Sequence, residues 1–327
     1  MIDPMPSRPR RNRSSAAMRD LMREIQVNKT DLIYPVFVRE GSGTSEEIGT
    51  MPGIHRHSLD HLVRHLDGVV ELGVRAVALF PVLGDDRKDR TASESVREEG
   101  LMQTSIRELK SRFPNLLLIT DVAMDPYSSD GHDGLVSEDG RILNDETLPI
   151  LADMAVSQAR AGADIVAPSD MMDGRVAVIR DALDDEGFTD VSICSYSAKY
   201  ASAFYGPFRD ALDSAPRSGD KKTYQMDPAN LNEALREVEL DIAEGADIVM
   251  VKPAGAYLDV ISEIAGISPL PIAAYQVSGE FAMIRYASQA GAIDEEAAML
   301  ESLVAIKRAG ADMIFTYFAP EAAKLLS

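Results

Sequence analysis

A short phrase, in which a glycine is followed by an apolar run, occurs four times in this chain and limits the folds open to it. The copies are Leu72-Gly-Val-Arg-Ala-Val-Ala-Leu-Phe80, Ala161-Gly-Ala-Asp-Ile-Val-Ala-Pro168, Glu244-Gly-Ala-Asp-Ile-Val-Met-Val-Lys252 and Ala309-Gly-Ala-Asp-Met-Ile-Phe-Thr-Tyr317. Glycine is favoured just after the last turn of a helix, where the backbone becomes left-handed. Each copy therefore predicts a helix end followed by a buried strand.

The spacing of these phrases predicts four further strands. Their glycines lie at 73, 162, 245 and 310, so the gaps of 89, 83 and 65 residues leave room for another strand and helix. Apolar runs at 31–38, 116–122, 191–196 and 271–277 supply the missing strands. Helical patterns lie between most of them, at 60–71, 93–111, 145–161, 199–213, 230–244, 256–264, 279–289 and 294–308.

Eight strands that alternate with helices predict an α/β fold, a closed (β/α)8 TIM barrel. An open, doubly wound sheet is the alternative. It is weakened because no Gly-x-Gly-x-x-Gly turn follows the first strand.

The first 28 residues differ in charge from the rest of the chain. Residues 1–27 hold six arginines against Asp3, Asp20 and Glu24, a net charge of +3 in a chain of net charge −20. We predict an N-terminal arm at 1–28 for oligomer contacts and a catalytic barrel at 29–327. A basic arm could bind nucleic acid or an acidic neighbouring subunit. We favour the neighbour, because the acidic body would repel a phosphate backbone.

Two compositional features predict the compartment. The chain has one cysteine, Cys194, which excludes an internal disulfide and fits a reducing environment. No apolar run approaches the length of a membrane span, and the N-terminus has no apolar signal segment. We therefore predict a cytoplasmic protein with no membrane or nucleic-acid partner.

Two lysines end neighbouring predicted strands. Lys252 precedes Pro253, which favours extended backbone. Burial lowers the pKa of a lysine toward the range in which a neutral amine can attack a ketone. A lysine paired with a carboxylate at the core rim is the alternative. Because Lys199 ends the preceding strand and two close cations lower each other's pKa, we favour Schiff-base chemistry.

Two polar segments follow strands of the barrel. The segment 121–133 holds four aspartates and one histidine, which suits Mg²⁺ or Ca²⁺ but also suits a loop of turn-forming residues. The segment 205–225 carries Arg209, Arg217, Lys221 and Lys222. It is either a lid that closes over an anionic substrate or an ordinary solvated loop.

Several long motifs resemble those of the porphobilinogen synthase, or 5-aminolevulinate dehydratase, family, from about residue 30 to the C-terminus. They are Gly245-x-Asp247 through Lys252-Pro-Ala-x-x-Tyr257, Ser195-Tyr-Ser-Ala-Lys199, Phe204-Tyr-Gly-Pro-Phe-Arg209, Ala167-Pro-Ser-Asp-Met-Met-Asp-Gly-Arg175, Asp121 through His132, and Tyr275-Gln-Val-Ser-Gly-Glu280.

The resemblance implies a function and an assembly. Members are (β/α)8 barrels with an arm that wraps a neighbour, usually as a homo-octamer. They join two molecules of 5-aminolevulinate into porphobilinogen with loss of two waters, early in haem and chlorophyll biosynthesis. Lys252 would form the Schiff base with the substrate that supplies the propionate side. Lys199 would bind or activate the second substrate.

The resemblance also assigns binding roles. The second substrate's carboxylate would be held by Arg209, Lys221 and Gln225, and the first's by Ser278 and Tyr317. Asp121 and Ser169 are implied in proton transfer and amine recognition. Tyr196 and Phe204 lie in the matching motifs and are predicted to contact substrate.

The metal prediction departs from the zinc-dependent members. Their three cysteines are replaced here by Ala123, Asp125 and Asp133, so no zinc is expected. Relatives with aspartate in this loop often depend on Mg²⁺ at an allosteric site between subunits, where Glu237 matches a ligand. Asp125 and Asp133 are further possible metal ligands. No organic cofactor is implied.

Two other functions stay open. A class I aldolase would use one Schiff-base lysine on the same barrel. A non-catalytic, cation-binding assembly subunit would form no product under any metal condition.

Overall fold

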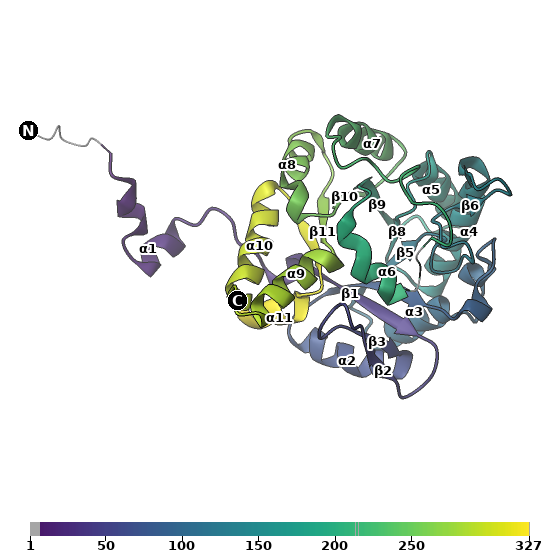
Figure 1. The fold of residues 1–327 in the computed structure, drawn as a ribbon, viewed down its shortest axis with the longest axis horizontal. Helices are drawn as coiled ribbons and strands as arrows, with labels where there is room; N and C mark the ends of the chain where they lie inside the picture. The colour runs from purple at the N-terminus through teal and green to yellow at the C-terminus, as the bar shows by residue number, and fades with distance from the viewer. Residues whose placement is uncertain (1–6, 213, 215, 327) are drawn as a thin grey trace, which may run out of the picture.

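Eight parallel strands close into a barrel in the computed structural model, which describes residues 7–212, 214 and 216–326 (Figure 1). The last strand pairs back onto the first, with Ile314 opposite Leu32 and Phe315 opposite Ile33. This closure confirms the barrel over the open sheet. The strands are β1 Leu32–Arg39, β4 Ala76–Val82, β5 Leu117–Val122, β8 Ile165–Pro168, β9 Ser192–Lys199, β10 Ile248–Lys252, β11 Ile272–Gln276 and β12 Met313–Thr316.

Helices surround the strands on the outside of the barrel (Figure 1). They bury an apolar face against the strands, as Leu62, Leu66 and Val69 do in the second helix. The main helices are α2 Leu59–Glu71, α3 Leu101–Arg112, α4 Asn144–Ala161, α5 Arg175–Asp185, α7 Asn232–Ala243, α8 Leu258–Ile267, α9 Ser278–Gln289, α10 Glu295–Ala309 and α11 Ala319–Leu325. Short turns are η2 Lys29–Asp31, η3 Asp85–Arg87, η4 Ser93–Val96, η5 Ala203–Tyr205 and η6 Gly255–Tyr257, with α6 Gly206–Leu212 over the barrel mouth.

The repeated phrase has the backbone that the sequence predicts. Its four glycines have φ of 98°, 111°, 101° and 124°, in the left-handed region where glycine alone is unstrained. In the last three copies an aspartate lies two residues after the glycine, and it has a role that the pattern did not reveal. Asp164 accepts a hydrogen bond from Leu118 N at 2.7 Å, and Asp247 and Asp312 each accept one from the neighbouring strand at 2.8 Å. Each aspartate thus fastens its strand to the preceding one.

The structure corrects three local predictions. The single helix predicted at 93–111 is η4 and α3, separated by an extended turn at Arg97–Gly100. The helix predicted at 199–213 is displaced, because β9 continues to Lys199 and only η5 and α6 are helical; its predicted last residue lies outside the described residues. Helix α5 was missed, because its apolar residues are not confined to the buried face, which also includes the charged Arg175.

A β-hairpin that the sequence did not predict covers the free part of β1. It consists of β2 Ser45–Glu47 and β3 His55–Ser58. Strand β12 pairs only with the first half of β1, and β3 pairs in parallel with the second half, from Phe37 to Arg39. The hairpin therefore satisfies backbone groups of β1 that would otherwise be unpaired. A second small hairpin, β6 Leu135–Val136 with β7 Ile142–Leu143, follows the 121–133 loop.

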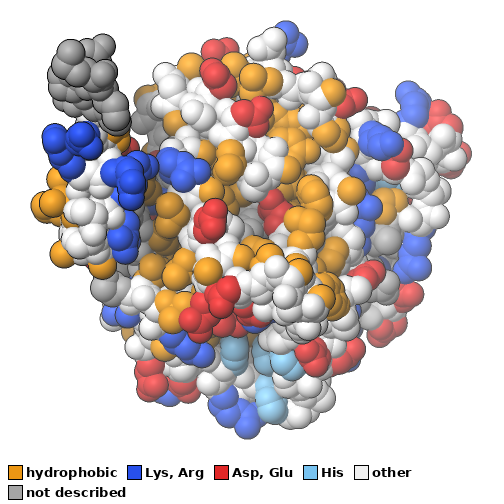
Figure 2. Space-filling view, turned by 60° about the vertical axis from the view of Figure 1, so that its left-hand side comes forward, with side chains coloured by type: hydrophobic (Ala, Val, Ile, Leu, Met, Phe, Trp, Pro, Cys, Tyr) orange, Lys and Arg blue, Asp and Glu red, His pale blue; other side chains and the backbone are white. Residues whose placement is uncertain are grey.

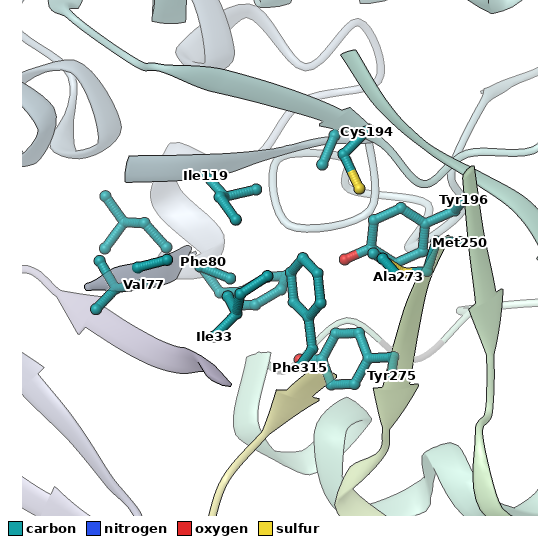
Figure 3. Close-up of a cluster of buried hydrophobic side chains, with 14 of the residues drawn as sticks. Ile33, Val77, Phe80, Ile119, Cys194, Tyr196, Met250, Ala273, Tyr275 and Phe315 are labelled. Atoms are coloured by element: carbon teal, nitrogen blue, oxygen red, sulfur yellow. The ribbon is translucent and has the colours of Figure 1, made fainter. Parts of the chain in front are cut away.

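The barrel interior is filled by side chains. The side chains labelled in Figure 3 come from several strands and point toward one another, among them Ile33, Val77, Ile119, Cys194, Met250, Ala273 and Phe315. All seven are buried. Substrates must therefore bind at the open end of the barrel, where the strands end, as in other proteins of this architecture.

The N-terminal segment extends away from the barrel (Figure 1). It contains η1 Pro9–Arg13 and α1 Ala16–Leu21, neither of which buries a residue. Its basic side chains, all of them arginines, gather on it in Figure 2. The side chain of Leu21 is 75% exposed. In the part of the chain that is described, no helix is long and apolar enough to cross a membrane.

Histidine side chains gather on one face of the molecule (Figure 2). The ring of His57 lies between His55, at 5.6 Å, and His65, at 4.9 Å. His57 is buried, and its Nδ1 has no partner among the described residues. Burial, followed by the neighbouring histidines, lowers the pKa of His57 to about 4.

We predict that His57 destabilises the protein in mild acid. An unfolded histidine titrates near pH 6.5, so between pH 6.5 and 4 the unfolded state binds more protons and stability falls as the pH falls. We expect a loss of about 1 kcal/mol at pH 5, allowing for solvent beside the ring, or roughly 2–4 °C in Tm. His57→Phe should flatten the decline in Tm between pH 7 and 5. His61→Phe on α2 removes only the smallest of the neighbouring charges that lower the pKa of His57, so it should flatten the decline much less. An unchanged slope in His57→Phe would contradict the assignment.

Candidate active site

Two lysines lie side by side at the open end of the barrel. Lys199 ends β9 and Lys252 ends β10, and the two residues are paired in register across the neighbouring strands. Both are buried, with exposed fractions of 6%. The prediction that the two side chains meet at one mouth is confirmed.

Aromatic rings surround the ammonium of Lys252. Its Nζ lies 4.6 Å from the ring centre of Tyr275, 5.0 Å from those of Tyr196 and Phe208, and 5.2 Å from that of Tyr205. Burial, followed by the charge of Lys199, lowers the pKa of Lys252 to about 7. No carboxylate of the described residues forms an ion pair with it, so the alternative of a salt-bridged rim lysine does not hold here. A neutral amine is accessible at physiological pH.

Lys199, by contrast, lies among charges. Its Nζ is 3.1 Å from Asp133 Oδ2 and donates to the backbone oxygen of Ser169. Asp133 also accepts from Lys221 Nζ at 2.6 Å, and Lys221 reaches Asp125 at 3.1 Å. Burial would raise the pKa of Asp133, but Lys199 and Lys221 hold it at about 2. Asp133 is therefore a carboxylate that orients both ammonium groups.

Asp121, on β5, carries the other perturbed carboxyl group. Burial, followed by the charge of Asp125, raises the pKa of Asp121 to about 7, against the opposing effect of the two lysines. The Ser169 side chain donates a hydrogen bond to it. A carboxyl group with this pKa can give and take a proton near neutral pH.

The segment after α6 is closed over this site and is fastened to the 121–133 loop. His132 lies 2.9 Å from the backbone oxygen of Ser218 and 3.0 Å from the hydroxyl of Tyr224. Arg217 N donates to Asp130 O at 3.0 Å. These contacts, with the burial of Lys221, favour a lid over a solvated loop. We call residues 216–225 the lid.

The remaining predicted substrate contacts come from α6, the lid, the start of α9 and the end of β12. Ser278 Oγ accepts from Phe208 N at 3.0 Å and donates to Phe204 O at 3.4 Å. Tyr317 OH lies 3.2 Å from Tyr275 OH. Arg209 is half-buried on α6, next to the ring that covers Lys252, and no described residue hydrogen-bonds its guanidinium. Gln225 is buried, and its Oε1 has no partner among the described residues.

Glu237 lies apart from the lysines. With Glu233, Asp173 and Gln225 it lines a cavity of about 990 Å³ behind the lid, to which neither Lys199 nor Lys252 contributes. This cavity therefore does not include the two lysines. Among the described residues, no three His, Cys, Asp or Glu side chains are grouped to hold a metal ion.

Sequence reasoning missed the side chains that give Lys252 its apolar surroundings. Tyr205 and Phe208 lie in the Phe204-Tyr-Gly-Pro-Phe-Arg motif and Tyr275 at a strand end, but no role was predicted for them. Aromatic residues next to a predicted lysine nucleophile were the available signal. Which ring faces the amine depends on how α6 folds over the barrel.

Comparison with known proteins gives a consistent result. A family model described as delta-aminolevulinic acid dehydratase matches residues 6–325. The chain is 57% identical over 323 residues to the chloroplastic delta-aminolevulinic acid dehydratase of Physcomitrium patens, covering 98% of this chain and 74% of the relative. It is 56% identical over 324 residues to that of Glycine max, covering 99% and 78%.

A solved structure shares the whole fold. It is delta-aminolevulinic acid dehydratase (porphobilinogen synthase) from Toxoplasma gondii ME49, in complex with the product porphobilinogen. The TM-score is 0.97 at 52% identity, covering 98% of this chain and 92% of that one.

The names of the relatives overturn one prediction. The plant relatives are named chloroplastic, so the predicted cytoplasmic location is wrong. The physical reason is that a single cysteine indicates a reducing environment but does not indicate which membrane encloses it.

Proposed function

The chain belongs to the delta-aminolevulinic acid dehydratase family, and we propose that it makes porphobilinogen through Schiff bases on Lys252 and Lys199. It is a lyase of porphyrin biosynthesis that condenses two 5-aminolevulinate molecules with loss of two waters. The observation that carries the lysine assignment is the register pairing of two buried lysines, one in an aromatic cage and one beside a carboxylate.

The first step falls to Lys252. Its neutral amine attacks the ketone of the first substrate, the carbinolamine loses water, and an imine forms. The aromatic rings exclude water and stabilise the cationic iminium through their faces. Asp121, with its raised pKa, supplies the proton that leaves with the hydroxyl and later takes one from carbon.

The second lysine has a different task. Lys199 binds the ketone of the second substrate, and an imine there makes the adjacent carbon acidic and the imine carbon electrophilic. Asp133 and the backbone oxygen of Ser169 orient its amine. One carbon–carbon and one carbon–nitrogen bond then form between the two substrates, and both lysine amines leave the former ketone carbons. Loss of a proton from carbon completes the pyrrole ring, and the two waters released are those of the two imine formations.

Two identical substrates need two different carboxylate sites. We propose that Arg209, Lys221 and Gln225 bind the second substrate's carboxylate and that Ser278 and Tyr317 bind the first's. In the closed lid Lys221 already pairs with Asp125 and Asp133, so a substrate carboxylate would share its ammonium with them. Tyr196 and Phe204 are proposed to line the substrate pocket, and the Tyr196 ring faces both lysines, at 5.0 and 5.9 Å.

The donor groups present favour Mg²⁺ away from the lysines and no zinc. Burial raises the pKa of Glu237, and Asp241, Asp173 and Glu233 raise it further while Arg175 opposes them. A divalent cation would relieve that repulsion; with one carboxylate and water as ligands, Mg²⁺ fits. We propose an allosteric Mg²⁺ at Glu237, between subunits.

The catalytic end of the barrel offers less to a metal. Asp125 and Asp133 do not fit one while two lysines hold their oxygens, and we derive no step through one. The one cysteine, Cys194, is buried inside the barrel, where burial raises the pKa of its thiol. No zinc and no organic cofactor are proposed.

We further propose that residues 1–28 form an arm and 29–327 the catalytic barrel, and that the arm assembles a homo-octamer. Support comes from the arm's exposed arginines, its exposed Leu21 and the acidic remainder of the chain.

The function is tested by trapping the Schiff base. The protein is incubated with 5-aminolevulinate and borohydride in EDTA, and the labelled peptide is mapped by mass spectrometry. We expect label on Lys252, at a rate that rises by up to about tenfold between pH 6 and 8, because the neutral amine forms as the pH passes its pKa of about 7.

Each other outcome has a definite meaning. Label only on Lys199 would reverse the two lysine roles. Label that requires added Mg²⁺ would move the metal into the catalytic site. Absence of both label and porphobilinogen would refute the function.

A further inference from the structure

Helix α6 carries side chains of the active site and is held at its N-terminal end by α9. Phe208 N donates to Ser278 Oγ at 3.0 Å. The backbone of α9 lies so close to the residues before α6 that no side chain fits between them, because a Cβ on Gly279 would lie 2.5 Å from the backbone oxygen of Phe204. This end of α6 therefore has one position relative to the barrel.

The C-terminal end of α6 is held by a residue far away in the sequence. Arg56, on β3, donates from Nε to Ala211 O at 2.7 Å and from Nη2 to Asp210 O. The last carbonyl groups of a helix have no partner within the helix, and a cation there also complements the helix dipole. The guanidinium thus caps two of these carbonyl groups, and Ser214 N donates to a third, that of Arg209, at 3.3 Å.

The orientation of Arg56 is fixed from its other side. Its Nη1 pairs with Glu46 on β2 at 3.0 Å, and Glu46 also pairs with Arg39 on β1. The hairpin β2–β3 therefore connects the end of β1 with the end of α6. No other role for this hairpin follows from the site described above.

The position of α6 decides two features of the site. Its Phe208 ring lies 5.0 Å from Lys252 Nζ and packs edge-on against Phe80 at 5.1 Å. Its Arg209 is the first of the basic residues proposed for the second substrate, and the chain then enters the lid that carries Lys221. Without the hydrogen bonds from Arg56, α6 would be fixed mainly at its N-terminal end, by Ser278. Rotation about that end would displace both Phe208 and Arg209.

We propose that Arg56 is a positioning residue for the lid, acting through α6, so that the second substrate's carboxylate meets Arg209 and Lys221 in place. This inference rests on the proposed function. The substrate on Lys252 depends on it less, because Tyr196 on β9 and Tyr275 on β11 face that amine independently of α6.

The test compares Arg56→Met with Arg39→Met, which removes the other partner of Glu46 but no contact to α6. For Arg56→Met we expect KM for 5-aminolevulinate to rise by about tenfold or more, the factor typical of losing a charged hydrogen bond. Borohydride labelling of Lys252 should stay within about twofold of the native rate. Arg56→Lys should bring KM only part of the way back to the native value. The lysine keeps the positive charge, but its ammonium cannot bridge two carbonyl groups as the guanidinium does.

A second measurement does not depend on activity. Trypsin cleaves after Arg217 and Lys222 in the lid, and we expect faster cleavage there in Arg56→Met than in the native protein or in Arg39→Met. If Arg56→Met does not fold, Glu46→Gln weakens the same hold and should give the same changes to a smaller degree.

The outcomes separate this inference from the proposed function. Unchanged KM and unchanged lid cleavage in Arg56→Met would overturn it, as would equal losses of kcat and Lys252 labelling without a change in KM. Faster lid cleavage in a protein whose native form makes no porphobilinogen would support the hold on α6 and refute only the function.

Discussion

Lys252→Met is expected to lower kcat for porphobilinogen by at least about 10³-fold, because no other group in the aromatic cage can form the first imine. Methionine has similar length and suits an apolar pocket, so the fold should persist. We expect Tm to be equal or higher, since a buried amine without a carboxylate partner is removed. Turnover is measured together with borohydride labelling of the peptide that contains residue 252, which should disappear.

The control is Lys324→Met, which removes an exposed lysine on α11. It should retain native turnover and labelling. Substantial turnover in Lys252→Met would mean that the imine forms elsewhere, and residual label on Lys199 would identify where.

Lys199→Met is expected to lower kcat by at least about 10²-fold while Lys252 still becomes labelled. This outcome separates two-lysine condensation from a one-lysine aldolase, which would keep substantial turnover. The charge of Lys199 also lowers the pKa of Lys252. Removal of that charge should therefore move the midpoint of the labelling rate to higher pH, since less amine is neutral at a given pH.

Lys199→Arg distinguishes the two roles of this residue. Arginine keeps the positive charge beside Asp133 but does not form a Schiff base with a ketone. We expect it to lose turnover as Lys199→Met does while its labelling of Lys252 keeps the native pH dependence. If Lys199→Arg retained activity, Lys199 would act only through its charge.

The sequence alone determined the barrel and the place of its chemistry. Burial of a strand on both faces requires a continuous apolar run, and the left-handed turn before it requires glycine. Both features can therefore be recognised in a short stretch of the sequence. Once the strands are known to be parallel, their ends lie at one mouth, and Lys199 and Lys252 must meet there. The same reasoning located Asp121 and Ser169.

Only the tertiary structure decided which partners these residues have. Asp133 was predicted as a possible metal ligand, but the folded chain brings it between Lys199 and Lys221. Phe208 reaches Lys252 and Arg56 reaches α6 because segments distant in sequence close over the same barrel end. A local pattern records whether a side chain is buried, since burial follows the period of the strand or helix. It does not record what lies opposite, because that depends on the packing of the whole chain.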